Sequence, residues 1–353
     1  MKALSFLLRW FLKIITFILG IALVFACGCV YISPTITWIP AFFGLYFVPL
    51  VLVNLLLLLL GLLKRSNATW IPFICLLPAL LFADLFVRWS RPQEAESGVS
   101  LKIATYNVCN FQGYEKKTRE ETLVEISRVL DASHIDVVCM QEFFYPDTAQ
   151  IARLFGAYPY QCFSQKNQKK SYRGNVIFSR FPIVAVGELT LPNTFRTCIY
   201  ADLNFHGRII RVYTTHLESN NISLNAMVDR IREIPENPDE IIRAHRRIRD
   251  AFQIRALQVE IVADHLQTTD IPFLFCGDLN DTPTSYTYHR LQKGLNDSFK
   301  YGGKGFGATF RYLWPALRID YIFYNQSFNM RSHQTLKVPF SDHYPVVVEL
   351  FVL

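Results

Sequence analysis

Fifty consecutive residues, from Ile14 to Leu63, contain no Asp, Glu, Lys or Arg, and this stretch constrains the fold of the 353-residue chain most. A helix needs about 20 apolar residues to cross a bilayer, so the stretch is too long for one span. The sequence Ser-Pro-Thr at 33–35 breaks it into two segments, 14–32 and 37–63. We expect each segment to form a transmembrane helix.

A third apolar segment, 68–88, follows almost directly and contains two prolines and one acid, Pro72, Pro78 and Asp84. With it, residues 1–90 are expected to form a membrane region of about three transmembrane helices. A cleaved signal peptide is the alternative for the first segment, but its apolar run is long for a signal sequence and further spans follow. Lipoprotein cleavage before Cys27 is disfavoured by Phe25.

Basic residues beside the spans predict how the chain crosses the membrane. Two groups flank the expected helices, Lys2, Arg9 and Lys13 before the first and Lys64 and Arg65 before the third. If both groups are cytoplasmic, three spans put the C-terminal domain on the extracytoplasmic side of the plasma or inner membrane. Arg88 and Arg91 favour the opposite side, and the prediction inverts if 68–88 does not span.

The polar segment 91–100 predicts a linker to a second domain at 101–353. That domain is long enough to bury a hydrophobic core without the support of disulfides or metal ions. The chain has a formal charge of +7, and residues 1–97 hold seven basic and three acidic residues, so the excess is spread over both parts. Such an excess permits an anionic partner but does not require one.

Cysteine spacing sets few constraints. None of the eight cysteines forms a Cys-x-x-Cys pair, and Cys139 and Cys276 lie in apolar runs. We therefore expect buried free thiols rather than a zinc site or a disulfide framework.

Short β-rich runs alternate with helical patterns after residue 100. Runs rich in β-branched and aromatic residues predict buried strands at 101–108, 135–142, 174–179, 197–205, 208–217, 271–278, 318–325 and 344–352. Helical patterns cover 118–133, with Thr118 and Glu121 as a capping box, and 240–266. His206-Gly207 predicts a hairpin turn. The strands are too many for one small sheet, so we expect an α/β fold of two packed sheets with helices outside.

Polar side chains recur at the ends of these apolar strands, namely Asn107, Glu142, His216, Asp278, Asn280, Asp320, Asp342 and His343. A single residue of this kind is more often a turn, cap or structural hydrogen-bonding residue. Their recurrence at one place in the pattern favours a shared site at one edge of the sheets.

The chemistry of these residues suits a hard metal ion. Glu142, Asp342 and the amide oxygen of Asn107 are oxygen donors of the kind that Mg²⁺ or Mn²⁺ prefers. No Cys/His cluster offers the ligands that zinc usually takes. A divalent ion beside an Asp–His pair suits attack of water on phosphorus. Glycoside hydrolysis also uses two carboxylates but gives no reason for paired histidines and an Asn.

The second domain resembles the endonuclease/exonuclease/phosphatase family, the metal-dependent phosphoesterases related to deoxyribonuclease I. Seven segments carry the resemblance in order, TYNVCNF, MQEFF, RGNVIFSRFPI, TTHLES, CGDLND, RIDYIFY and SDHYPV. They span about 101–353, and GDxN and SDHxP are specific in combination. The resemblance implies a four-layered α/β/β/α sandwich, two packed mixed sheets flanked by helices, and hydrolysis of phosphoric esters.

The resemblance also implies roles. The metal ligands would be Asn107, Glu142 and Asp342. The attacking water would be activated by Asp278, while Asn280 and His216 would contact the phosphate. His343 would be the catalytic histidine, held in one tautomer by Asp320.

Other positions carry weaker signals. Asn175, within RGNVIFSRFPI, would approach the substrate, and an ordinary core strand explains it equally well. Cys109 stands where abasic-site enzymes often carry an acid, which disfavours that branch. The basic stretches 166–174 and 243–255 suit a solvated face, anionic head groups or a polyanion. Arg255 and Gln258 share a helical face, where packing or capping explains them.

We therefore expect a membrane-anchored, Mg²⁺-dependent hydrolase that cleaves phosphodiester or phosphomonoester bonds in nucleic acid, phospholipid or a phosphorylated small molecule. Membrane tethering favours a lipid or head-group phosphodiesterase over a nuclease, and no protein partner is implied. The alternative is a catalytically silent partner-binding module, which is disfavoured because Glu142, Asp278 and His343 are all present. A channel or transporter is disfavoured because Asp84 is the one charge that lies away from the ends of the expected spans.

Overall fold

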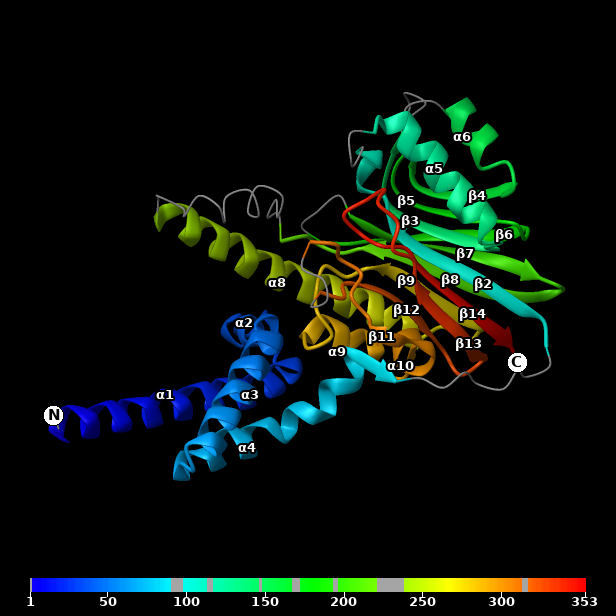
Figure 1. The fold of residues 1–353 in the computed structure, drawn as a ribbon. Coiled ribbons are helices and arrows are strands. Elements are labelled where there is room, and N and C mark those ends of the chain that lie inside the picture. The colour runs from blue at the N-terminus through cyan, green and yellow to red at the C-terminus, as the bar shows by residue number, and fades with distance from the viewer. Residues whose placement is uncertain are drawn as a thin grey trace.

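The computed structural model describes residues 2–89, 98–112, 117–145, 148–166, 172–192, 196–220, 238–312 and 317–353. Figure 1 shows a helical head beside a larger body of two packed sheets. The head consists of α1 (Lys2–Gly28), η1 (Cys29–Tyr31), α2 (Ile39–Leu45), α3 (Phe47–Leu63), η2 (Asn67–Thr69), α4 (Trp70–Leu76) and η3 (Pro78–Leu85).

One helical segment of the head, Trp10–Tyr31, is long and apolar enough to cross a membrane. Two further pairs pass the same criteria only when each is taken as one bent span. These are Ile39–Leu45 with Phe47–Leu63, bent by 65°, and Asn67–Leu76 with Pro78–Leu85, bent by 46°. The predicted segment 68–88 is therefore not one continuous helix, because Pro78 lacks the amide that would extend α4.

Two six-stranded mixed sheets form the body. The first has the order β13-β14-β2-β3-β5-β4 and the second β10-β12-β9-β8-β7-β6. The strands of the first are β2 (Ser100–Asn107), β3 (Val137–Tyr145), β4 (Tyr160–Lys166), β5 (Tyr172–Ser179), β13 (Phe328–Thr335) and β14 (Val346–Val352). Those of the second are β6 (Ile183–Thr190), β7 (Thr197–Phe205), β8 (Arg208–His216), β9 (Phe273–Asp278), β10 (Asn296–Asp297) and β12 (Asp320–Tyr324).

Helices cover the outer face of each sheet (Figure 1). They are α5 (Arg119–Ala132) and α6 (Thr148–Leu154) on the first sheet, and α8 (Pro238–Gln267), α9 (Tyr286–Gln292) and α10 (Ser298–Gly302) beside the second. A core between the sheets joins Ile103 and Ile177 to Val212 and Leu274, all fully buried. Separate cores pack the helices against the outer faces. This arrangement confirms the predicted four-layered α/β/β/α sandwich.

Local signals read from the sequence are confirmed in this body. Thr118 and Glu121 form both hydrogen bonds of a capping box at the start of α5. His206 and Gly207 adopt positive φ angles of 53° and 89° between the paired strands β7 and β8, which suits a tight hairpin. Cys139 and Cys276 lie buried in strands β3 and β9.

The head packs directly on the body. Strand β1 (Val87–Trp89) pairs antiparallel with β11 (Lys304–Phe306), and Lys300 forms an ion pair of 3.0 Å with Asp84. The buried guanidinium of Arg318 donates through Nε to the carbonyl of Leu85 at 3.2 Å. Elements that the sequence assigned to the membrane region thus pair with strands and side chains of the second domain.

Candidate active site

Sheet topology brings four strand ends to one edge. Strands β2 and β3 are parallel neighbours, and so are β8 and β9, so the carboxyl ends of each pair point the same way. Asn107 ends β2, and His216 lies opposite Asp278 at the ends of β8 and β9. Asp320 lies opposite Asp278 because the antiparallel strand β12 begins there. Rigid strands therefore fix the separations between these side chains.

A β-bulge places Glu142 in the site. The pairing of β3 with β5 shifts register between Met140 and Phe143, and Glu142 has a φ of +50°. Such a bulge re-aims a side chain at the edge of a sheet. The amide of Asn110 donates to Glu142 Oε2 at 3.2 Å, and Asn110 is a site neighbour that the sequence did not reveal.

Asp278 is the centre of the site and is fully buried. Its Oδ2 accepts from Asn107 Nδ2 at 2.9 Å, and its Oδ1 accepts from the backbone N–H of Asn280 at 2.8 Å. The Nε2 atoms of His216 and His343 lie 3.6 and 3.8 Å from the same Oδ2. Burial, followed by the nearby carboxylate of Asp320, raises the pKa of Asp278 to about 7.

His343 is held between acids. Its Nδ1 lies 2.9 Å from Asp320 Oδ2, so the ring donates to that carboxylate. Burial lowers the pKa of His343, but the charges of Asp320 and Asp278 outweigh it and raise the pKa to about 10. The imidazole is therefore a cation at neutral pH, with its Nε2–H facing Asp278.

His216, unlike His343, is a neutral imidazole. Burial, and then the positive charges of Arg196 and His343, lower its pKa well below the ordinary value. Arg196 Nη1 lies 2.6 Å from Nδ1, and since a guanidinium only donates, Nδ1 accepts and Nε2 carries the proton. Within the described residues this buried Nε2 has no hydrogen-bond partner. A neutral donor thus points at Glu142 and Asp278.

The segment that follows His216 is supported from beneath by α8. Arg255, fully buried, donates to the carbonyl of Glu218 at 2.7 Å and to Asn220 Oδ1 at 3.0 Å. Gln258 accepts from the Glu218 N–H at 2.9 Å. Glu218 in turn forms an ion pair with Arg196 at 3.3 Å. The shared face of Arg255 and Gln258 therefore positions the residues that hold His216.

Three other predicted residues lie around this centre with structural partners. The side chain of Asn280 donates to the Leu217 carbonyl at 3.1 Å. Asp342 Oδ1 accepts from Ser341 at 3.2 Å, and Ser341 also donates to the Asn107 carbonyl at 2.7 Å. Asn175 is buried, and its amide donates to the Thr197 carbonyl at 2.8 Å. Of the predicted residues, Asn175 makes the contact that a core strand alone would explain.

The donor set fits a hard divalent cation. Asn107 Nδ2 donates to Glu142 Oε1 and Asp278 Oδ2, so two carboxylates of different strands converge at one point, while the Asn107 amide oxygen accepts from the backbone N–H of Cys109 at 3.0 Å. Carboxylate oxygens of Asp278 and Asp320 lie within 4.8 Å of one another beside a ring nitrogen of His343, and since that imidazole is protonated at both nitrogens, the two carboxylates are the usable donors of this cluster. The buried Asp320 Oδ1 has no hydrogen-bond partner among the described residues. Such an excess of buried oxygen donors suits a hard ion such as Mg²⁺ or Mn²⁺.

Comparison with known protein families identifies the two-sheet body and the helical head as separate matches. The family model "Endonuclease/Exonuclease/phosphatase family" matches residues 104–343, and "Domain of unknown function (DUF8431)" matches residues 9–84. No curated protein matches the chain.

Solved structures match the body. An endonuclease/exonuclease/phosphatase from Beutenbergia cavernae is 21% identical, with a TM-score of 0.53 and 72% of each chain covered. The human Nocturnin catalytic domain with bound sulfate is 22% identical, with a TM-score of 0.53, covering 73% of this chain and 97% of that one. A mannosyl-6-phosphatase from Bacteroides thetaiotaomicron is 18% identical, with a TM-score of 0.50, covering 71% and 99%. At these identities the likeness concerns the fold.

Proposed function

The chain belongs to the endonuclease/exonuclease/phosphatase family, and we propose that it is a membrane-anchored, divalent-metal-dependent phosphoesterase. The family acts on phosphoric esters and depends on divalent metal ions. One observation supports the proposal above the others. A single buried oxygen, Asp278 Oδ2, faces the Nε2 atoms of His216 and His343 at 3.6 and 3.8 Å.

Asp278 is proposed to activate water. With its pKa raised to about 7 by burial and by Asp320, it is a stronger base than an ordinary carboxylate. It would take a proton from water as the water oxygen attacks phosphorus. The backbone N–H of Asn280 orients the carboxylate through its other oxygen.

The two histidines are proposed to stabilise the phosphate from different charge states. His343 would offer Nε2–H from a cation that Asp320 holds in place, which offsets charge on the phosphate oxygens. His216 would donate from a neutral ring whose tautomer Arg196 selects. Both donors are fixed before substrate arrives, so little reorganisation is needed at the moment of reaction.

A divalent ion would be held by Glu142 and by the amide oxygen of Asn107, with assistance from Asp342, and the Asn107 amide would have to turn its oxygen away from the Cys109 backbone N–H to do so. When bound, it supplies positive charge against the developing charge of the phosphoryl group. Asn175 and Asn280 remain proposed substrate contacts.

The membrane region is proposed to comprise residues 1–90 and the catalytic domain residues 101–353, joined by the linker 91–100. The apolar helix at Trp10–Tyr31 supports the anchoring. A phospholipid or its head group is the favoured substrate class, because a tethered domain meets such a substrate at high local concentration. Nucleic acid is the second class.

The test uses the full chain in detergent with plasmid DNA, single-stranded RNA, sphingomyelin and an inositol polyphosphate, each with Mg²⁺ and with EDTA. His343→Asn is expected to lower turnover by about 10²–10⁴-fold. The matched change His206→Asn, at an exposed turn, should leave it unchanged. Turnover that survives EDTA or His343→Asn would contradict the proposal. No turnover of any substrate by the folded chain would support the silent binding module.

A further inference from the structure

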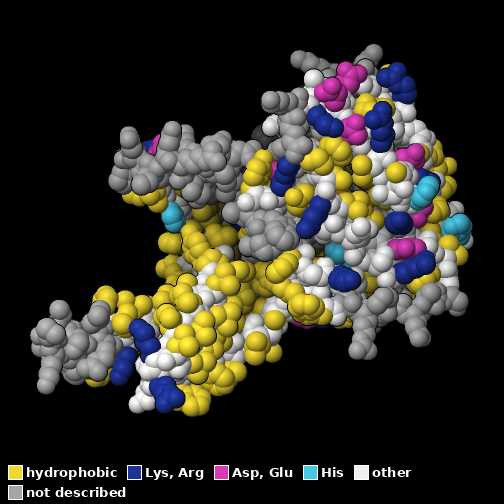
Figure 2. Space-filling model, in the orientation of Figure 1, with side chains coloured by type: hydrophobic (Ala, Val, Ile, Leu, Met, Phe, Trp, Pro, Cys, Tyr) yellow, Lys and Arg dark blue, Asp and Glu magenta, His cyan; other side chains and the backbone are white. Residues whose placement is uncertain are grey.

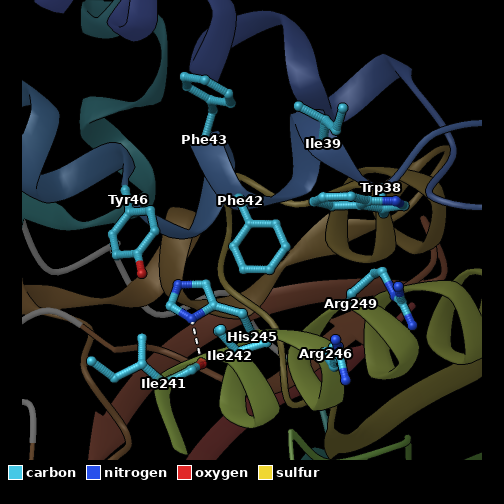
Figure 3. A pocket seen from close by; sticks show the side chains of 10 residues that line it. All are labelled: Trp38, Ile39, Phe42, Phe43, Tyr46, Ile241, Ile242, His245, Arg246 and Arg249. Atoms are coloured by element: carbon cyan, nitrogen blue, oxygen red, sulfur yellow. Dashed lines mark hydrogen bonds between the residues drawn. The ribbon is translucent and has the colours of Figure 1, made fainter. Parts of the chain in front are cut away.

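A groove separates the head from the first turns of α8. It has a volume of about 630 Å³, within the range of small-molecule sites. Figure 3 shows side chains of the head on one side facing those of α8 on the other. Its walls include Trp38 and Phe42 from the head and Ile241, Ile242, Arg246 and Arg249 from α8.

Four residues on one side of α8 form one wall of the groove. Ile241 and Arg249 are two turns apart, and Ile242 and Arg246 are one turn apart, so all four lie on one side of the helix. Ile241 and Ile242 are 47% and 48% exposed, although both are large and apolar. Water-exposed isoleucines in pairs beside a cavity indicate a surface that another apolar group covers.

The head supplies an aromatic wall. Phe42 packs edge-on against Phe252 at 5.2 Å and stacks on His245 at 5.7 Å, which fixes it between the two parts. The apolar surface of the groove is continuous with that of the head (Figure 2). A molecule that enters the groove can therefore remain in contact with the surface proposed to face lipid.

Positive charge lies at one end of the groove. Figure 3 shows Arg246 and Arg249 on the α8 side of the groove, at the end below Trp38. Arg249 pairs with its neighbour Asp250 at 2.7 Å. Arg246 is exposed and forms no ion pair within the part of the chain that the structure describes. A planar guanidinium binds a phosphate through two parallel hydrogen bonds.

We propose that this groove binds one anionic phospholipid of the surrounding bilayer. An acyl chain lies between Phe42 and the two isoleucines, and the phosphate binds Arg246 and Arg249. The amphipathic pairing of an apolar cavity with a basic end matches this occupant, whereas a free phosphate ion would leave the apolar walls uncovered. The inference rests on the proposed membrane anchoring and does not depend on the catalytic reaction.

The test is native mass spectrometry of the full chain in detergent with dioleoyl phosphatidylglycerol or dioleoyl phosphatidylcholine. We expect one phosphatidylglycerol per chain and weaker binding of phosphatidylcholine. R246E/R249E should lower retention of phosphatidylglycerol about tenfold. I242W, which fills the groove, should lower retention of both lipids.

The matched control is R243E/R247E, which makes the same change of charge at two exposed arginines of α8 that do not line the groove. It should retain phosphatidylglycerol within about twofold of the parent chain. Equal loss in both double variants would show attraction by overall charge and overturn the inference. So would unchanged retention in R246E/R249E and I242W, or a co-purifying polypeptide in place of lipid.

Extraction of membranes with alkaline carbonate tests the anchoring separately. If the chain stays in the membrane but its retention of lipid does not depend on the groove residues, lipid binding in the groove is contradicted and the anchoring is not. A chain that is extracted, yet binds phosphatidylglycerol through Arg246 and Arg249, contradicts the spans and supports the groove.

Discussion

At the scale of single residues, His343 links the electrostatics of the site to stability. Asp320 and Asp278 raise its pKa to about 10 against the effect of burial. A raised pKa means that the folded state holds the proton more tightly than the unfolded state. This contribution to stability is therefore complete below pH 6.5 and is lost as the pH rises through about 10.

We predict that the melting temperature of the metal-free chain falls between pH 8 and pH 10, and that Asp320→Asn flattens this fall. At pH 7 the variant should melt about 5–10 °C lower, since a charged hydrogen bond to a buried group is lost. Asp278, with its pKa raised to about 7, has already ionised before this window. The measurement is thermal unfolding in EDTA across that range.

Asp202→Asn is the control, because it removes a carboxylate that pairs with Arg211 at 2.6 Å and forms no ion pair with a histidine among the described residues. It should lower stability without changing the slope between pH 8 and pH 10. If the melting temperature of Asp320→Asn falls as steeply as that of the parent chain between pH 8 and pH 10, His343 does not titrate as proposed.

The residues that carry the proposed chemistry are visible in the sequence because they end apolar strands, whereas their partners are not. Arg196 holds Nδ1 of His216, although it lies 20 positions earlier and outside any motif. Asn110 reaches Glu142 only because a bulge turns Glu142 toward it. Such contacts depend on tertiary register, which local pattern does not contain.

At the scale of elements, sequence patterning found the central strands and missed the edges. All eight predicted runs became strands, but the outermost strands β4, β6, β10 and β13 were not predicted. Strands β4, β10 and β13 lack the dense apolar run that marks a buried strand, since an edge strand has one paired side and more solvent. Strand β6 opens with the apolar run Ile-Val-Ala-Val and was missed although this pattern was present. Strand β6 is mostly exposed along its length. The site is built on central strands, which is why its residues were found.

We predict that Gly277→Ala damages both fold and activity. Gly277 has a φ of +155°, and an added Cβ would lie 2.3 Å from the carbonyl oxygen of Thr215, its partner on β8. The backbone must move to relieve this contact, and His216 and Asp278 are the next pair along. We expect a loss of about 3 kcal/mol in the free energy of unfolding, together with loss of turnover.

The control for this prediction is Gly294→Ala, where φ is +80° and no atom lies within 4 Å of an added Cβ. Its cost should be only about 1 kcal/mol, with turnover kept. Chemical denaturation and activity assays compare the two variants. Equal losses would show that close approach of β8 and β9 does not determine the site.

At the scale of the whole molecule, a packed joint that includes β1, Leu85 and Arg318 holds the head against the body. Leu85 is buried in the core under α8, and β1 covers the edge of β11. We predict that a chain starting at Gly98 melts about 5–10 °C below one starting at Leu77, since Arg318 loses a buried carbonyl partner. Thermal melts of the two chains in detergent decide this. Equal melting temperatures would mean that the joint adds no stability.

The proposed extracytoplasmic position of the second domain can be tested from where the ends of the head lie. Figure 1 shows the N-terminus and the turn between α3 and α4 at the end of the head away from the body. The basic groups that include Lys13 and Lys64 belong to these parts of the chain. We predict that a reporter fused after Lys64 is cytoplasmic and that one fused after Leu353 is extracytoplasmic. Two cytoplasmic reporters would instead mean that residues 68–88 lie against the body without crossing, so that the site would face cytoplasmic substrates.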